Sequence, residues 1–396
     1  MISQPEVNIG LLGHVDHGKT TLTKAITGKW TDTHSEEIKR GISIRLGYAD
    51  AKIYYCAKCK LYGTKEKCSK CGGKTEFKRW VSFVDSPGHE SLMTTAIAAS
   101  SIMDGALLLI SANEPCPQPQ TEEHLMILNI LGIKNIVVVQ TKIDLVSKER
   151  ALEHHKEIKK FLKGSVAENA PILPVAAISG VNIDKVLEAI ETHIPTPKRE
   201  ENAIPLMLVS RSFDVNKPGT PVKELKGGVV GGSLVRGRIK VGEELEISPG
   251  IERNGIPKQV RFVVEKLMIE NQEISEAKPG GLVAIGTGLD PSLTKSDQLS
   301  GSIVSLPGKT PKPKDVIEIK YHLLERKDIE NPPLKDGEPV VVNVYTSTDV
   351  GVIVKLGKGI ATIKLKRPIA FESGNRAAIS RKIGQRWRLA GWGEVV

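Results

Sequence analysis

The amino-acid sequence predicts an α/β domain, built on a mostly parallel sheet with helices on both faces, followed by two β-barrel domains. Three observations support this prediction. The first half of the chain alternates short apolar runs with amphipathic stretches. From about residue 203 the pattern changes to many short β-like segments broken by Gly, Pro and Asn. At 396 residues the chain is also too long for one ordinary hydrophobic core, so we expect two or three domains.

In the first half, the apolar runs have the length of strands. They are "VNIGLLG", "VSFVD", "ALLLISA", "NIVVVQT" and "PILPVAA". Between them, helical patterns cover residues 88–101, 120–131, 148–163 and 182–193. This alternation is typical of a parallel sheet that is covered on both faces.

In the second half, segments such as "GGVVGGSLVRGRIKVG", "PVVVNVY" and "GVIVKLGKGIATIKLKRPIAF" favour β-barrels. The stretch "HIPTPKREENAIP" is a plausible linker, and "PGKTPKPKD" marks a second boundary. We therefore expect domains at residues 1–200, 201–312 and 313–396, with an insertion at about 52–80 in the first domain.

The composition is that of a soluble globular protein, with 40% hydrophobic and 26% charged residues. No window approaches the roughly 18 unbroken apolar residues of a membrane-spanning helix. The N-terminus "MISQPEVNIGLLG" lacks the basic segment and cleavage site of a signal peptide. We expect a cytoplasmic protein with no membrane partner, in which the five cysteines stay reduced.

The net charge of +10 is unevenly distributed along the chain. Residues 52–80 hold nine Lys or Arg and two Glu, a local charge of +7, and residues 201–396 hold 30 basic and 23 acidic side chains. This asymmetry favours an anionic partner such as nucleic acid. The alternative, that the lysines only keep the surface solvated, stays open.

The segment "GLLGHVDHGKTTLTKAI" predicts a phosphate-binding loop, because a strand precedes G-x4-G-K-T and a helix follows it. Gly13 and Gly18 permit a tight loop whose backbone N–H groups point into its centre. Lys19 supplies a cation for the β and γ phosphates, the Thr20 hydroxyl can bind Mg²⁺, and the helix N-terminus adds its positive dipole.

Two further segments distinguish the nucleotide. In "DSPGH", Asp85 ends a strand and faces the metal, and the Gly88 N–H can reach a γ phosphate. In "TKID", the Asp144 carboxylate can accept both N–H groups of the guanine N1/N2 edge, which adenine lacks, and Lys142 can lie along the base. The sequence therefore predicts a site for GTP and GDP. We expect it to comprise Gly13, Val15, Asp16, His17, Gly18, Lys19, Thr20, Thr21, Asp85, Gly88, Thr141, Lys142, Asp144, Ala176, Ala177 and Ile178.

Four of the five cysteines lie in the segment "CAKCKLYGTKEKCSKC". Cys56, Cys59, Cys68 and Cys71 have the spacing of a four-thiolate Zn²⁺ site, in which two short C-x2-C turns close a tetrahedron. The metal would replace the core that a loop of this size cannot build. Cys116 has no partner in the sequence, and we expect a packed thiol.

The motifs together resemble the translational GTPases of the elongation-factor family, and within it the gamma subunits of archaeal translation initiation factor 2. The match rests on "GHVDHGKTTLTKAITG", "VDSPGHESLMTTA", "ANEPCPQPQT", "RSFDVNKPGT", "SEAKPGGLVAIGTGLDPSLTKSD" and "GQRWRLAGWGEV", and spans essentially the whole chain. The resemblance implies GTP hydrolysis and delivery of methionylated initiator tRNA to the small ribosomal subunit. It also implies alpha and beta partner subunits in a heterotrimer, and a zinc knuckle at the cysteines.

The same resemblance implies roles for further residues. Ser43 falls at the position of the second hydroxyl ligand of Mg²⁺, and His89 at that of the side chain that orients the attacking water. Asp16 is unusual because a carboxylate near polyphosphate is repelled unless a cation intervenes. Whether it helps to bind a second metal with the Gly41 carbonyl is left open.

Two positions depart from the family pattern. Thr141 stands where most members have Asn, and Ala176 where many have Ser. We expect guanine binding to survive both changes. Two other functions are weighed: a selenocysteine-type elongation factor, disfavoured because no further domain follows "GWGEVV", and a non-hydrolysing GTP-binding scaffold, disfavoured by His89.

Overall fold

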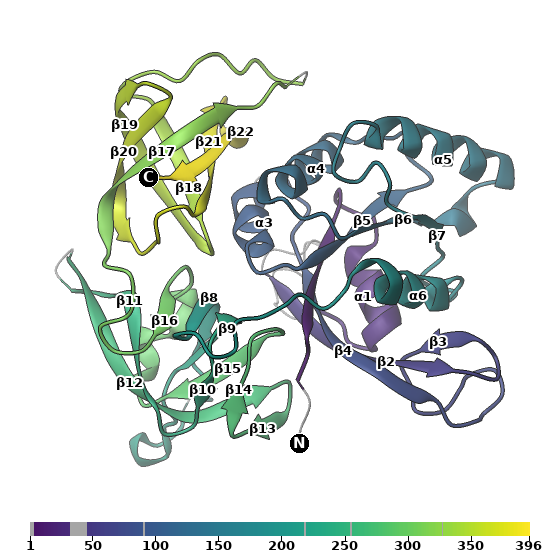
Figure 1. Cartoon of the computed structure of the whole chain (residues 1–396), viewed down its shortest axis with the longest axis horizontal. Helices are drawn as coiled ribbons and strands as arrows, with labels where there is room; N and C mark the ends of the chain where they lie inside the picture. The colour runs from purple at the N-terminus through teal and green to yellow at the C-terminus, as the bar shows by residue number, and fades with distance from the viewer. Residues whose placement is uncertain (1–3, 32–45, 90–91, 218, 254–255, 327) are drawn as a thin grey trace. The chain divides into compact units, whose positions relative to one another are not determined.

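The computed structural model describes residues 4–31, 46–89, 92–217, 219–253, 256–326 and 328–396 (Figure 1). The chain divides into two compact units. One unit is Pro5–Pro197, and the other joins Met1–Gln4 to Lys198–Val396. No described helix has the length and apolar character needed to cross a membrane.

The unit Pro5–Pro197 is an α/β domain around one seven-stranded sheet, with strand order β3-β2-β4-β1-β5-β6-β7. Strands β4, β1, β5, β6 and β7 run parallel, while β2 is antiparallel to both β4 and β3. The strands are β1 (Val7–Leu12), β2 (Gly47–Cys56), β3 (Leu61–Gly63), β4 (Glu76–Asp85), β5 (Gly105–Ser111), β6 (Ile136–Thr141) and β7 (Ile172–Pro174). The helices are α1 (Lys19–Thr27), α3 (Met93–Ser100), α4 (Pro119–Leu131), α5 (Lys148–Leu162) and α6 (Ile183–His193), with a 3-10 turn η2 (Ile143–Leu145).

The buried central strands explain why these segments contain almost only apolar residues. Side chains alternate along a strand, so Ile9 and Leu11 of β1 share one face and pack with Leu22 of α1 and Ile190 of α6. On the other face, Gln140 of β6 donates to a backbone carbonyl of α5. The predicted sheet with helices on both faces is confirmed.

The antiparallel strand β2 and the first half of β4 lie on either side of the cysteine insertion. They form a long two-stranded extension that carries the insertion at residues 52–80. Arg79 anchors the extension, because its Nε donates to Glu191 Oε1 at 2.6 Å and its Nη2 to the Ile190 carbonyl at 2.8 Å. Both acceptors lie on α6, so the base of the insertion is attached to the core of the domain.

The second unit contains two closed β-barrels, as predicted. In the first barrel, strands β11-β16-β8-β9-β15-β12 form the ring, the β11–β12 pairing closes it, and β13 extends β12. In the second, the ring is β17-β20-β19-β18-β21-β22, closed between β22 and β17. The first barrel region comprises β8 (Leu206–Phe213), β9 (Val229–Arg236), β10 (Ile239–Lys240), β11 (Glu244–Arg253), β12 (Ile256–Ile269), β13 (Gln272–Ile274), β14 (Glu276–Ala277), β15 (Val283–Thr287) and β16 (Ile303–Ser305). The second comprises β17 (Lys314–Leu323), β18 (Pro339–Val344), β19 (Ser347–Gly357), β20 (Ile360–Ile369), β21 (Arg376–Ile383) and β22 (Arg386–Val395).

Candidate functional site

The turn from β1 to α1 has the geometry of a phosphate-binding loop. Gly13 has φ of 147°, and a Cβ there would lie 2.4 Å from the Leu109 carbonyl oxygen, so only glycine fits. Gly18 has φ of 84° and directly precedes α1. The buried Lys19 Nζ donates to the carbonyls of Gly13 at 2.9 Å and His14 at 2.8 Å. Its ammonium group thus lies within the loop, in position to meet an anion.

Asp85 ends β4 next to this loop, since Leu11 of β1 is its register partner. The Asp85 carboxylate is buried, and its Oδ2 accepts hydrogen bonds from Thr20 Oγ1 at 2.8 Å and Thr31 Oγ1 at 2.6 Å. Thr31 was not among the residues predicted from the sequence. Carboxylate and hydroxyl oxygens are ligands that Mg²⁺ accepts, so these residues fit the metal that a nucleotide site needs.

Gly88 lies directly against the phosphate-binding loop. A Cβ at this position would be 2.4 Å from Lys19 Nζ and 3.0 Å from the Val15 backbone nitrogen, so the close approach requires glycine. His89 follows in the chain and is half-buried. Burial lowers the pKa of His14, although the charge of Glu114 opposes the shift.

His17 is a member of the predicted nucleotide site, but its side chain is buried in the fold. Nδ1 lies 2.9 Å from the Leu109 carbonyl oxygen, and Nε2 lies 3.3 Å from Glu114 Oε2. Burial lowers the pKa of His17 to about 3, although the hydrogen bond to Leu109 opposes the shift. The ring is therefore neutral near pH 7, and only the backbone of His17 is left to contact a phosphate.

Two further predicted residues, Asp16 and Thr21, lie in the phosphate-binding loop and at the start of α1. Asp16 is exposed, with φ of 61°, and Thr21 is partly buried in the first turn of α1. Ser43 and Gly41 lie outside the described residues.

Thr141 connects the predicted base-binding segment to the phosphate-binding loop. It ends β6 and is 2% exposed. Its Oγ1 donates to the His17 carbonyl at 2.8 Å. A hydroxyl can donate only one hydrogen bond, so in this arrangement Thr141 supports the loop and has no second donor for a base.

The structure brings the two predicted base-binding segments together. The Ile143 N–H donates to the Val175 carbonyl at 3.4 Å, so the loop after β6 lies beside the loop after β7. Asp144 is exposed in η2, and Lys142, with φ of 56°, precedes it. The Ala176 N–H donates to the Val181 carbonyl at 3.3 Å. Of the predicted donors to a base, the Ala176 N–H is therefore already used within its own loop.

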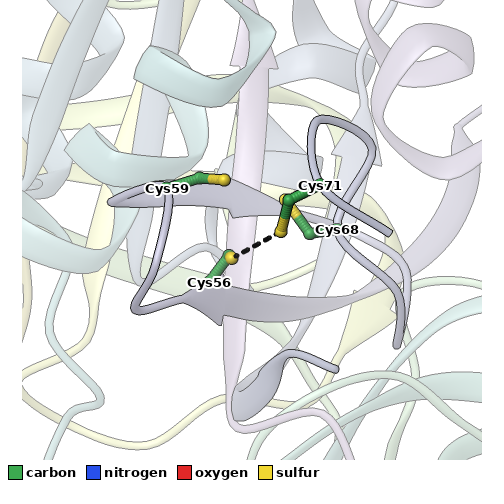
Figure 2. A group of neighbouring side chains, drawn as sticks. All are labelled: Cys56, Cys59, Cys68 and Cys71. Carbon is green, nitrogen blue, oxygen red and sulfur yellow. Dashed lines mark hydrogen bonds between the residues drawn. The ribbon is translucent and has the colours of Figure 1, made fainter. Parts of the chain in front are cut away.

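The four cysteines of the insertion form one cluster (Figure 2). Their Sγ atoms all lie within 4.8 Å of one another, and those of Cys56 and Cys71 are 3.7 Å apart. In a tetrahedral zinc site with Zn–S bonds of about 2.3 Å, neighbouring sulfurs are about 3.8 Å apart. The backbone N–H groups of Cys71 and Lys70 lower the pKa of Cys68 to about 6, which favours its thiolate, while the hydrogen bond with Cys71 raises the pKa of Cys59 to about 12. The cluster therefore fits a zinc ion.

Cys116 lies apart from this cluster, as expected. Burial, with Glu157 and Glu122 contributing, raises the pKa of its thiol to about 12. The thiol is therefore protonated near pH 7.

Two family models match the chain. The Elongation factor Tu GTP binding domain matches residues 4–196, and the C-terminal domain of initiation factor eIF2 gamma matches residues 315–395. The first match contains the whole phosphate and base site described above.

Curated relatives match the chain over nearly its full length. The translation initiation factor 2 subunit gamma of Pyrococcus horikoshii is 55% identical over 401 residues, which covers 99% of this chain and 98% of the relative. That of Methanocaldococcus jannaschii is 54% identical over the same length, with the same coverage of both proteins.

Solved structures share the fold. The bacterial selenocysteine-specific elongation factor EF-Sec superposes with a TM-score of 0.76 at 26% identity. This chain is covered to 98% and spans only 58% of that protein. The elongation factor SelB of Methanococcus maripaludis, solved with the GTP analogue GppNHp, gives a TM-score of 0.75 at 23% identity, covering 100% of this chain and 80% of SelB.

Proposed function

The chain belongs to the family of translation initiation factor 2 gamma subunits, and from this premise we propose that it delivers methionylated initiator tRNA to the small ribosomal subunit. It binds the tRNA in the GTP state, and GTP hydrolysis to GDP releases it. The chain is a translational GTPase.

One observation supports the nucleotide chemistry most strongly: phosphate-, metal- and base-binding groups meet at one edge of the sheet. Lys19 follows β1, Asp85 ends β4, and Asp144 follows β6. These strands run parallel and lie close together in the order β4-β1-β5-β6, so their carboxyl ends share one edge. Ligands of open α/β sheets bind at this edge.

Each group has one role in this proposal. The loop N–H groups and Lys19 bind the β and γ phosphates, and Asp144 accepts from the guanine N1/N2 edge. Thr20 and Asp85 would hold Mg²⁺, which would neutralise phosphate charge. Ser43 would supply the second hydroxyl ligand of the metal, and Asp16 with the Gly41 carbonyl would hold a second ion.

His89 is the proposed catalytic residue. It follows Gly88, whose backbone packs against the loop where the γ phosphate would bind. From there the imidazole can orient a water molecule for in-line attack on the γ phosphorus, while the bond to the β–γ bridging oxygen breaks and GDP leaves.

The cysteine cluster is proposed to hold one structural Zn²⁺. Its sulfur spacing supports a closed four-thiolate site, which leaves no open position for a substrate. The lysines around it are exposed: Lys58, Lys60, Lys65, Lys67, Lys70 and Lys74. We infer that the zinc knuckle presents this positive charge to RNA.

For the remaining organisation we propose what the family implies. Residues 1–200, 201–312 and 313–396 act as a GTP-binding domain and two barrel domains. The chain assembles with alpha and beta subunits into a heterotrimer and works in the cytoplasm. A selenocysteine-type elongation factor is less favoured, because EF-Sec is 26% identical to this chain whereas the gamma subunits reach 55%.

The proposal is tested by changing the nucleotide that controls tRNA binding. Asp144→Asn can donate to the C2 carbonyl of xanthine, so XTP should replace GTP as its preferred nucleotide. Filter binding then compares methionylated initiator tRNA with elongator tRNA, in GTP and in XTP, for both proteins.

We expect the unchanged chain to retain initiator tRNA with GTP only, and Asp144→Asn to retain it with XTP. Equal retention of both tRNAs would contradict the initiator role. Retention that ignores the nucleotide would contradict the GTP-controlled carrier.

A further inference from the structure

We propose that Thr31 is a positioning residue of the Mg²⁺ site, whose hydroxyl holds the Asp85 carboxylate in the orientation that metal binding requires. The observation behind it is the 2.6 Å hydrogen bond from Thr31 Oγ1 to Asp85 Oδ2. This inference rests on the proposed function, because the metal belongs to the nucleotide site.

Two hydroxyl groups converge on the same carboxylate oxygen. Thr20 Oγ1 and Thr31 Oγ1 lie 2.8 Å and 2.6 Å from Asp85 Oδ2. Two directional hydrogen bonds to one oxygen fix the rotation of the carboxylate plane, which one bond alone would leave freer. Thr20 can use an oxygen lone pair for the metal while its hydroxyl still donates to Asp85. Thr31 contributes only the second donor, so it orients the carboxylate without being a ligand itself.

The fold leaves room for this contact at the ends of two strands. Gly47 begins β2 and is the register partner of Asp85, the last residue of β4. A Cβ at Gly47 would lie 2.6 Å from the Thr31 Cβ and 3.3 Å from the Asp85 Cβ. The missing side chain of Gly47 therefore gives Thr31 the space from which its hydroxyl reaches the carboxylate.

The burial of Asp85 makes the orientation matter. The residue is 1% exposed, so water cannot easily replace a lost donor. A buried carboxylate that loses a hydrogen bond is expected to turn toward another donor. That rotation weakens its contribution to a divalent cation, while the groups proposed to bind guanine, such as Asp144, stay as they are.

The experiment measures how the affinity for a fluorescent, non-hydrolysable GTP analogue depends on the concentration of free Mg²⁺. A sample with EDTA supplies the affinity without metal. Thr31→Val removes the hydroxyl at nearly constant volume, and Thr31→Ser keeps it. Gly47→Ala places a methyl group where the Thr31 side chain lies and should displace the hydroxyl. Thr192→Val is the matched control, because the Thr192 hydroxyl donates to the Glu188 carbonyl within α6.

We expect Thr31→Val and Gly47→Ala to raise the half-maximal Mg²⁺ concentration roughly tenfold, the effect of losing one hydrogen bond to a charged group. Affinity in EDTA should stay unchanged, and Thr31→Ser and Thr192→Val should match the unchanged chain.

An unaltered Mg²⁺ dependence in Thr31→Val or, if that variant does not fold, in Gly47→Ala would overturn the inference. An equal loss of affinity in EDTA would overturn it too, because it would reveal a general structural role. If the unchanged chain binds the analogue without any Mg²⁺ dependence, the proposed metal site itself fails, which is a separate result.

Discussion

Replacing Thr141 with Val removes the hydroxyl that joins the end of β6 to the phosphate-binding loop. The lost bond is the 2.8 Å contact to the His17 carbonyl, at a residue that is 2% exposed. A buried carbonyl left without its donor costs about 1–3 kcal/mol, so we expect the free energy of unfolding to fall by about that amount. Because the loop that binds phosphate is then held less firmly, GDP affinity should fall by up to about tenfold.

Urea unfolding without nucleotide and titration with fluorescent GDP measure the two effects separately. Thr121→Val is a matched control, since Thr121 is also a fully buried threonine and its hydroxyl has no hydrogen-bond partner among the described residues. That control should be neutral or slightly stabilising. The reasoning fails if Thr141→Val matches Thr121→Val in stability and the unchanged chain in GDP affinity.

Thr141→Asn tests the same position by adding hydrogen-bonding groups instead of removing one. An Asn amide can donate to guanine N7 while its carbonyl oxygen or remaining N–H contacts the loop, which the single Thr hydroxyl cannot do. GDP and GTP should both bind tighter, by roughly one decade or less, and the preference for guanine over adenine should persist. Unchanged or weaker binding would mean that neighbouring residues already supply the missing amide.

Three further predictions concern the other groups of the domain. His89→Ala should slow stimulated GTP hydrolysis by roughly two decades or more at nearly constant GTP affinity, and unchanged single-turnover hydrolysis would exclude a water-positioning role. Metal analysis should find about one zinc per chain, lost in Cys56→Ser with a lower melting temperature but kept in Cys116→Ser. A zinc-free chain of full thermal stability would contradict the structural role. Burial lowers the pKa of His17 to about 3. Between about pH 6.5 and pH 3, His17 is therefore protonated in the unfolded chain but neutral in the folded chain. The unfolding free energy should therefore fall between about pH 6.5 and pH 3, by an amount on the order of a few kcal/mol for this group. His17→Asn should flatten that decline in urea unfolding curves, and an equally steep decline would assign it to other groups.

The alternation of strands and helices was predictable because it depends on residues that are neighbours in the chain. A central strand such as Val7–Leu12 is apolar throughout since both of its faces are buried. The register in which the antiparallel strand Gly47–Cys56 pairs with β4 could not be predicted in the same way, because it depends on contacts between residues far apart in the chain.

The sequence by itself determined the local motifs. Gly13 and Gly18 specify the loop because their backbone angles are open to glycine, and each C-x2-C turn places two sulfurs on one side of a short segment. Such geometry is set within a few bonds, so spacing alone predicts it.

Only the tertiary structure decided which side chains hold these motifs in place. Thr31 meets Asp85 across 54 positions of the chain, and Thr141 meets His17 across 124. The same holds for the direction of the His17 ring, which turns into the fold toward Leu109. A threonine hydroxyl has no sequence signature for its partner, because the partner is chosen by strand register and by the space that packing leaves. Short motifs thus supply the chemical groups of the site, whereas the orientation of these groups depends on contacts that exist only once the sheet has formed.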